Sequence, residues 1–205
     1  MKIYIGIDQS INSTGICLKK YKDEKLIYEH FYIITNKTTK KALLYSQSLD
    51  NFNYIIYEKH EKSEASDNNE FEMNKLINNI FITNYIIDII DKSIENDSDL
   101  IFIGMEGISY QSGQTKSLID LAGLSTLIRY RIIEYFNKKN NNGALNIFTP
   151  AEIKKFVTGN GNASKDSMVN LFKTSYKDIS KLPKIDDIAD AYWICTYFKE
   201  IVNIL

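Results

Sequence analysis

The amino-terminal part of the chain alternates between hydrophobic and polar positions, as β-strands do. Over Lys2–Asp8 an isoleucine occupies every second position, so the isoleucines face one side and the final acid faces the other. A turn-rich stretch, Gln9–Gly15, leads into the apolar run Ile16–Leu18, and Lys25–Thr35 is again rich in strand-forming residues. The pattern predicts three antiparallel strands, the first of which ends on an aspartate.

Farther along, the hydrophobic period changes to that of helices, interrupted by short apolar runs. Glu70–Asn96 and Thr115–Lys139 place apolar residues at helical spacing and predict two long helices. Leu100–Glu106 and Ala144–Thr149 are short and apolar, which is typical of buried central strands. Further predicted elements are a short strand at Asn53–Tyr57 and helices over Ala151–Val157, Lys165–Tyr176 and Asp186–Val202. This order predicts an α/β fold whose mixed sheet, antiparallel strands first and parallel strands afterwards, carries helices on both faces.

Length and composition fit one globular domain. The chain has 205 residues, 44% of them hydrophobic and 25% charged, with a formal net charge of −1. These values exclude a disordered chain, and 9 Gly, 2 Pro and 2 Cys exclude a collagen-like or disulfide-built protein. We expect a single domain over residues 1–205, with an insertion at about 36–75, where the pattern blurs.

Several features concern the compartment. Cys17 and Cys195 lie in apolar runs and are expected to be buried thiols in a reducing environment. No apolar stretch is long enough to cross a membrane, and the first residues lack the form of a signal peptide. A cytoplasmic protein is therefore expected.

Charge is distributed unevenly despite the near-neutral total. Residues 58–99 hold 11 acids and 4 lysines, whereas residues 150–184 hold 7 lysines and 3 acids. A basic stretch within a neutral protein is typical either of a local phosphate-binding surface or of an ordinary solvated helix face. A contact with nucleic acid is therefore expected to be local.

Four acids occupy positions from which they could act together. Asp8 and Glu106 each end a predicted strand, and Asp187 and Asp190 lie three residues apart on one face of the last predicted helix. Strand-end aspartates often cap turns and helical acids often face solvent, but this helix is largely apolar around its two aspartates. Gathered carboxylates repel one another unless a hard cation such as Mg²⁺ or Mn²⁺ lies between them. The pattern favours a phosphodiesterase site in which these acids hold two ions.

Four blocks of the sequence carry a family resemblance. They are GIDQSINSTG at Gly6–Gly15, IFIGMEG at Ile101–Gly107, TPAEIKKFVTGNGNASK at Thr149–Lys165 and DDIADAYWI at Asp186–Ile194. In this order and with this spacing they resemble the RuvC-type Holliday-junction resolvases of the RNase H-like superfamily, particularly the phage-borne branch. Each block alone is a weak indication, but the four together are a strong one.

The resemblance implies a magnesium-dependent endonuclease, with Mn²⁺ as a substitute, that makes paired nicks in four-way and related branched DNA. Asp8, Glu106, Asp187 and Asp190 fall on the metal-binding acids of the family, which hold two ions per active site. The same resemblance implies a homodimer, in which each subunit nicks one of two opposing strands.

Basic and loop residues follow from the same resemblance. Lys165, with a catalytic role, and Lys154 fall on the two functional lysines near the scissile backbone. The other residues expected at the DNA are Lys155, Thr158, Gly159, Asn160, Gly161 and Tyr110, the last as the aromatic residue that helps to open the junction. The helix Thr115–Lys139 takes the place of the dimer helix, where Gly123 permits close approach.

Other interpretations stay open. The interval from Asp8 to Glu106 is longer than in the bacterial enzymes, with the excess around Lys37–Glu72, which leaves the substrate preference open. Alternatives are an RNase H-like nuclease on other branched or hybrid substrates and a DNA-binding relative without activity. An actin-like or sugar-kinase ATPase also begins with a strand, an aspartate and a Thr-Gly turn, but 205 residues are too few for its duplicated domain.

Overall fold

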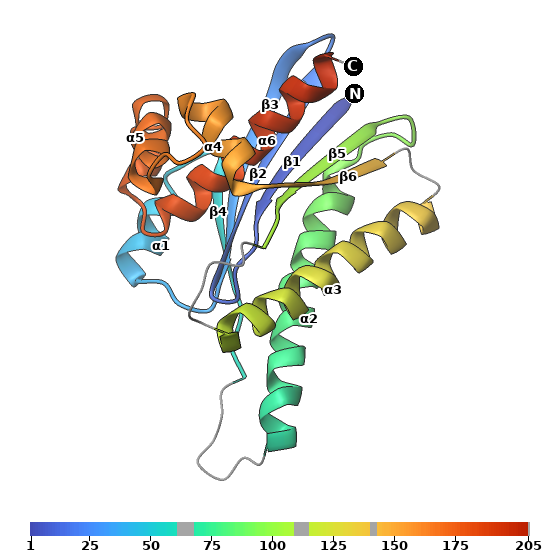
Figure 1. The fold of residues 1–205 in the computed structure, drawn as a ribbon, viewed down its shortest axis with the longest axis vertical. Coiled ribbons are helices and arrows are strands. Elements are labelled where there is room, and N and C mark those ends of the chain that lie inside the picture. Colours follow the sequence, from blue (N-terminus) through green and yellow to red (C-terminus); the bar gives the residue numbers. More distant parts are fainter. Residues whose placement is uncertain (61–67, 109–114, 140–142, 205) are drawn as a thin grey trace.

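The computed structural model describes residues 1–60, 68–108, 115–139 and 143–204, which form a six-stranded sheet between two layers of helices (Figure 1). The strand order is β4-β3-β2-β1-β5-β6. β1, β2 and β3 pair in antiparallel fashion, whereas β5 and β6 run parallel to β1, and β4 runs parallel to β3. The strands are β1 (Lys2–Asp8), β2 (Ser13–Lys22), β3 (Lys25–Thr35), β4 (Phe52–Ile56), β5 (Leu100–Glu106) and β6 (Gly143–Phe148).

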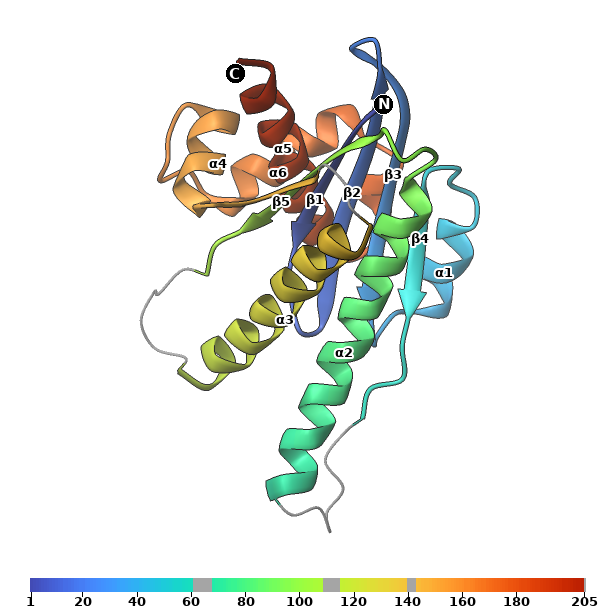
Figure 2. The ribbon, with the colours of Figure 1, turned by 90° about the vertical axis from the view of Figure 1, so that its right-hand side faces the viewer.

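Helices cover both faces of this sheet, which confirms the predicted α/β architecture. Two long helices lie on one face, and the shorter helices together with the carboxy-terminal one lie on the other (Figures 1 and 2). The helices are α1 (Lys40–Ser46), α2 (Asn68–Ser93), α3 (Thr115–Lys139), α4 (Pro150–Thr158), α5 (Lys165–Ser175) and α6 (Ile185–Ile204), with a 3₁₀ turn at Ile179–Lys181. Among the described residues, no helix is both long and apolar enough to cross a membrane.

Alternate residues of the central strands build one hydrophobic core on each face. Ile3, Ile5 and Ile7 of β1 pack with α2 and α3. On the opposite face Tyr4 and Cys17 pack with α5 and α6, and Cys17 and Cys195 are buried free thiols, as expected. Burial of a large apolar side chain contributes about 1.5–3 kcal/mol, so the period-two pattern fixes which side of each strand faces α6.

β2 is longer than the sequence pattern predicts because its second half buries lysines. The apolar run Ile16–Leu18 lies in the middle of a ten-residue strand. The ammonium group of Lys19 lies 3.4 Å from Glu29 on the neighbouring strand and 3.9 Å from the centre of the Tyr192 ring, which compensates for its burial. Because lysines are usually exposed, the sequence pattern does not reveal that this half of β2 is a buried strand.

The region of the expected insertion contains regular structure. α1 and β4 both lie within residues 36–75, and β4 pairs with β3 to extend the sheet by one strand. The predicted strand at Asn53–Tyr57 coincides with β4 to within one residue at each end. The segment thus contributes the outermost strand on the side away from β6.

Candidate active site

The pairing of β1 with β5 places Asp8 beside Glu106. The two strands run parallel, with Gly6 opposite Gly104 and Ile7 opposite Met105, so that each strand ends one residue later on an acid. The isoleucines of β1 face α2 and α3, and side chains alternate, so both acids lie on the face covered by α6. This register therefore places the two acids next to each other at the same edge of the sheet.

Two glycines allow α6 to lie unusually close to these strand ends. A Cβ atom on Gly6 would collide with the carbonyl oxygen of Ala191, and a Cβ atom on Gly15 would collide with the backbone of Asp187. Only glycine therefore fits at these positions. The close approach brings the first half of α6 over the carboxyl ends of β1 and β5, and Asp187 and Asp190 lie on that half, three residues apart.

Burial and the charges of neighbouring acids raise the pKa values of all four acids. Burial, followed by the charges of Asp190, Asp187 and Glu106, raises the pKa of Asp8 well above its usual range. Burial, followed by the charge of Asp190, raises the pKa of Glu106 to about 7. Burial also raises the pKa of Asp187 to about 6 and raises that of Asp190. Raised pKa values of this kind are typical of acids in a catalytic or metal site.

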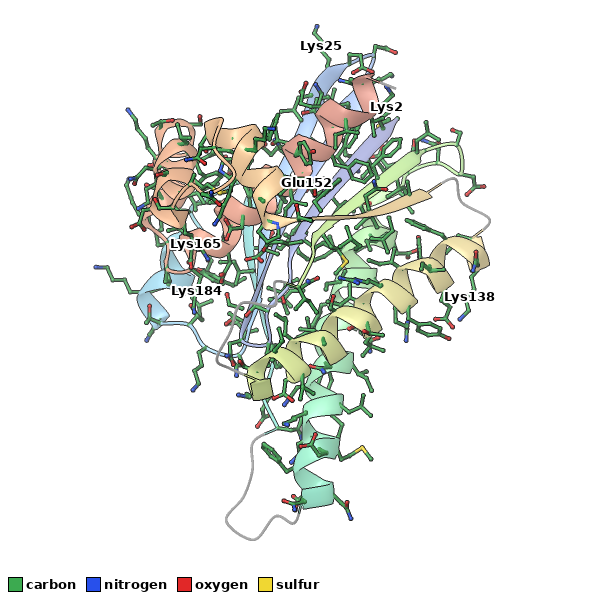
Figure 3. All side chains as sticks on the ribbon, viewed as in Figure 1. Lys2, Lys25, Lys138, Glu152, Lys165 and Lys184 are labelled. Carbon is green, nitrogen blue, oxygen red and sulfur yellow. The ribbon has the colours of Figure 1, made fainter. Side chains whose placement is uncertain are left out.

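A cavity of about 290 Å³ opens next to the acids, between β5, α4, α5 and α6. Its polar lining comes from Glu106, Asp190, Lys154 and Lys165, and apolar residues complete it. The Nζ atom of Lys165 lies 3.1 Å from Asp190 Oδ2, and the charge of Lys154 lowers the pKa of Glu106 against the larger, opposite effect of burial. Figure 3 shows Lys165 on the side of α5 and α6, far from Lys2 and Lys25. Both lysines predicted from the sequence thus lie at the acid cluster.

The loop between α4 and α5 has a defined shape and presents its residues to solvent. Gly159 adopts a left-handed backbone (φ 77°) and its N–H donates to the Lys155 carbonyl oxygen at 2.8 Å, which ends α4. The Asn160 N–H donates to the hydroxyl of Thr158 at 3.2 Å. Lys155, Gly159 and Asn160 are exposed, and Thr158 and Gly161 are half-buried. Tyr110 lies outside the described residues.

Two residues at the site were missed by the sequence analysis. The side-chain amide of Gln9 donates to the carbonyl oxygen of Glu106 at 2.7 Å, and its own Oε1 atom is buried and has no hydrogen-bond partner in the part of the chain that the structure describes. Asp186 lies 3.1 Å from the Nζ atom of Lys165. Gln9 lies in the turn-rich stretch Gln9–Gly15, and Asp186 lies next to the spaced pair Asp187 and Asp190. Neither residue is therefore distinguished in the sequence by its type or its spacing.

The donor set fits a hard divalent cation. All four acids offer carboxylate oxygens, and the Oδ2 atom of Asp187 is buried with no hydrogen-bond partner among the described residues. Over the described ranges, no three His, Cys, Asp or Glu side chains are already placed so that together they could hold a metal ion. The four acids influence the same site, but they are not arranged as a complete set of metal ligands. The Oδ2 atom of Asp190 is paired with the ammonium group of Lys165.

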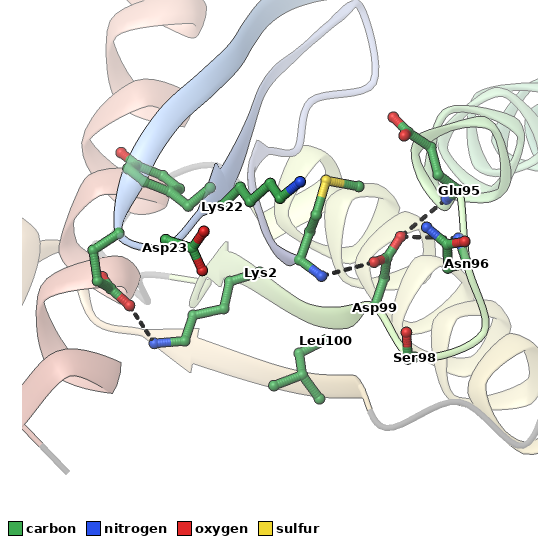
Figure 4. A pocket seen from close by; sticks show the side chains of 11 residues that line it. Lys2, Lys22, Asp23, Glu95, Asn96, Ser98, Asp99 and Leu100 are labelled. Carbon is green, nitrogen blue, oxygen red and sulfur yellow. Dashed lines mark hydrogen bonds and ion pairs between the residues drawn. The ribbon is translucent and has the colours of Figure 1, made fainter.

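A larger cavity, of about 600 Å³, lies at the opposite end of the sheet (Figure 4). There the Oδ1 atom of Asp99 accepts from the amino group of Met1 at 2.8 Å, and its Oδ2 atom accepts from the backbone N–H groups of Glu95 and Asn96. Lys2 pairs with Glu24 at 2.7 Å. These acids already have fixed partners, so the geometry favours the smaller cavity as the reactive one.

Comparison with known proteins gives relatives of one kind. The family model described as crossover junction endodeoxyribonuclease RuvC matches residues 86–196, just over half of the chain. The protein of that name from Fusobacterium nucleatum is 39% identical over 57 residues, which cover 28% of this chain and 30% of that protein. The one from Dictyoglomus thermophilum is 28% identical over 107 residues, which cover 43% of this chain and 66% of that protein. The matches thus span less than two thirds of the length of these relatives.

A solved structure shares the fold over nearly the whole chain. Thermus thermophilus RuvC in complex with a Holliday junction substrate aligns with a TM-score of 0.51 and 10% identity, covering 98% of this chain and 96% of that one. The family match contains Glu106, Lys154, Lys165, Asp187 and Asp190, and the shared fold extends to β1 and Asp8. The chain accordingly belongs to the RuvC family of crossover junction endodeoxyribonucleases.

Proposed function

We propose that the protein is a metal-dependent endonuclease that hydrolyses phosphodiester bonds in branched DNA, four-way junctions above all. The observation that carries the proposal is the gathering of Asp8, Glu106, Asp187 and Asp190 beside Lys154 and Lys165. The family membership supports the same activity, and a bound junction is reported for the Thermus thermophilus relative.

The acids and lysines divide the work of the proposed reaction. Asp8, Glu106, Asp187 and Asp190 would hold Mg²⁺ or Mn²⁺, two ions in our proposal, which would neutralise their charge and activate the attacking water. Water adds to phosphorus, the bond to the 3′ oxygen breaks, and that oxygen takes up a proton, which leaves a 5′-phosphate and a 3′-hydroxyl. Lys165 would offset the negative charge that develops on the phosphoryl oxygens.

DNA would be held by the basic side of the cavity and the neighbouring loop. Lys154 is half-buried in the wall of the cavity, from which its ammonium group can contact a phosphate beside the acids. Lys155, on the same helix as Lys154, and residues 159, 160 and 162 of the loop that follows this helix are exposed. Their exposed backbone and side-chain donors suit the DNA backbone more than base edges, so we infer that the protein recognises DNA shape.

A homodimer would let two such sites nick opposing strands symmetrically. The helix proposed for the dimer contact, α3, leaves Ile119, Tyr130 and Ile133 between 51% and 65% exposed. Apart from the adjoining backbone of its own helix, none of the described residues has an atom within 4 Å of the place that a Cβ on Gly123 would take. The exposed apolar face of α3, with free space above its glycine, supports close packing against a second copy of the chain.

A comparison of substrates tests the proposal. Purified protein is mixed with a synthetic four-way junction, a flap, linear duplex and an RNA–DNA hybrid, with Mg²⁺ and with EDTA. We expect paired nicks in the junction that need the cation. Preferred cleavage of the hybrid would point to the RNase H-like alternative, binding without cleavage would point to an inactive relative, and ATP hydrolysis without DNA cleavage would overturn the proposal.

A further inference from the structure

Lys165 is held by two carboxylates, and only one of them belongs to the predicted acid cluster. Its Nζ atom lies 3.1 Å from Asp190 Oδ2 and 3.1 Å from Asp186 Oδ2. Asp190 is 18% exposed and lines the cavity, whereas Asp186 is 46% exposed and is not part of the lining. One ammonium group therefore bridges a candidate cation ligand and a carboxylate outside the ligand set.

The position of Asp186 favours a negative charge. It lies in the first turn of α6, where the helix dipole and unpaired N–H groups favour negative charge. Its Oδ2 atom lies 3.1 Å from the ammonium group of Lys165, and its side chain is not part of the cavity lining, unlike that of Asp190.

The position of Lys165 explains why its ammonium group needs a carboxylate partner besides Asp190 to stay in place. Lys165 is the first residue of α5, where the same helix dipole disfavours a positive charge. Its side chain is half exposed, and a four-carbon stem loses rotamer freedom when it is fixed in one place. A cation on Asp190 would repel the ammonium group, and Asp186 is the second carboxylate that the structure places within 3.1 Å of it.

We propose that Asp186 is a positioning residue that keeps Lys165 at the acid cluster after a divalent cation has engaged Asp190. The inference rests on the proposed function, in which Asp190 holds the cation and Lys165 acts on the phosphoryl group. Asp186 touches neither; it acts through Lys165. The Lys165–Asp186 pair then replaces the bridge seen here, and the ammonium group stays within reach of the phosphate.

A double-mutant cycle in cleavage tests this assignment, with Lys165→Ala, Asp186→Asn and the combination compared at saturating junction and Mg²⁺. We expect Asp186→Asn to lower the single-turnover rate about tenfold with unchanged junction affinity, since the lost contact acts on the reacting state. We expect Asp186→Glu to recover most of the rate, and Asp186→Asn to have no further effect in the Lys165→Ala protein. Additive effects of the two changes would overturn the assignment.

Metal affinity gives a readout that does not require activity. Mn²⁺ is titrated into DNA-free protein and followed by its electron paramagnetic resonance. In Asp186→Asn, Lys165 has only Asp190 as a partner and competes with the ion, so we expect Mn²⁺ to bind several-fold more weakly. In the Lys165→Ala protein this competitor is gone, and Asp186→Asn should change the affinity much less. An equal loss in both backgrounds would show that Asp186 acts only through its own charge.

A matched control separates positioning from general electrostatics. Asp178→Asn also removes an exposed carboxylate that pairs with a lysine, Lys181 at 2.8 Å, away from the cavity. We expect this variant to retain wild-type cleavage and Mn²⁺ binding; a loss equal to that of Asp186→Asn would overturn the inference. If wild-type protein failed to cut the junction while the Mn²⁺ coupling held, the proposed function would fail and the assignment of Asp186 would stand.

Discussion

The two ends of the central strands contain acids with opposite electrostatic character. At the amino end, Asp99 is 1% exposed, and its oxygens accept from an ammonium group and two backbone N–H groups. At the carboxyl end, Asp8 lies near three further acids, and a buried oxygen of Asp187 has no hydrogen-bond partner within the described ranges. Burial raises the pKa of Asp99 but its donors outweigh burial and lower it, whereas the pKa of Asp8 is raised.

This difference distinguishes a structural acid from a reactive one in a single sheet. An acid with fixed donors stabilises the fold, while acids that repel one another lower stability and are retained where a cation or substrate can satisfy them. Cavity size alone would have selected the amino end, where the larger cavity lies. The partners of the acids, and not the volume, indicate which end is reactive.

The largest expected effect would separate the two ends by activity. Asp8→Asn should lower the single-turnover cleavage rate at least about 1000-fold, since the amide keeps the shape but lacks the charge that a cation requires. Junction binding, measured by mobility shift, should persist. Asp88→Asn, an exposed change on α2, should cut like wild type. Normal cutting by Asp8→Asn would show that the carboxyl end is not the active site.

The next effect concerns how α6 is held at the reactive end. Gly15→Ala should lower the free energy of unfolding by about 3 kcal/mol, because the new methyl group would collide with the backbone of Asp187. Urea denaturation measures this change. A loss below about 1 kcal/mol would mean that α6 has room to move away from the strand ends.

At the amino end, Asp99→Asn should lower the free energy of unfolding by about 2 kcal/mol at pH 7, since charge-assisted hydrogen bonds are lost. The folded-state pKa of Asp99 is lowered, so its stabilisation is present above the unfolded value of about 4 and is lost as the pH falls through the folded value. The difference between variant and wild type should therefore shrink at acid pH. A constant difference from pH 7 to pH 2 would contradict this explanation.

At the reactive end the same substitution should act in the opposite direction. In metal-free protein, Asp8→Asn should raise the free energy of unfolding by about 1 kcal/mol at pH 8, because it removes one repelling carboxylate. The raised pKa of Asp8 means that wild-type stability falls as the pH rises from about 4 toward the folded value. The gain should thus diminish toward pH 4. Destabilisation at pH 8 would remove the contrast between the two ends.

The smallest expected effect is on DNA binding. Lys154→Ala should weaken junction binding several-fold and reduce the slope of log affinity against log salt by about 1, as expected for one lost phosphate contact. Lys2→Ala, at the opposite end of the sheet, should change neither quantity. Equal salt slopes for Lys154→Ala and wild type would place the DNA elsewhere.

Part of the site could be predicted from the sequence because it follows from strand geometry. Alternation determines the face on which Asp8 and Glu106 lie, and parallel pairing determines their shared edge. The spacing of Asp187 and Asp190 determines their common helix face. The family resemblance predicts both lysines at the same site, and Lys154 and Lys165 line its cavity.

The rest depends on contacts between distant parts of the chain. The close packing of α6 on the sheet depends on Gly6 and Gly15, and their role is evident only once the position of this helix is known. The pairing of Lys165 with Asp186 depends on where a long, flexible side chain settles. The full length of β2 was hidden because buried lysines, which pair with acids across strands, look like exposed positions in a sequence.

The close fit of α6 on the glycine-lined strand ends has a consequence for biosynthesis. Asp8 emerges from the ribosome early, with β1, but Asp187 and Asp190 emerge only with the helix that must seat upon it. A partly synthesised chain therefore contains Asp8 and Glu106 but lacks Asp187 and Asp190. The nascent polypeptide would therefore lack the proposed activity until α6 has been synthesised.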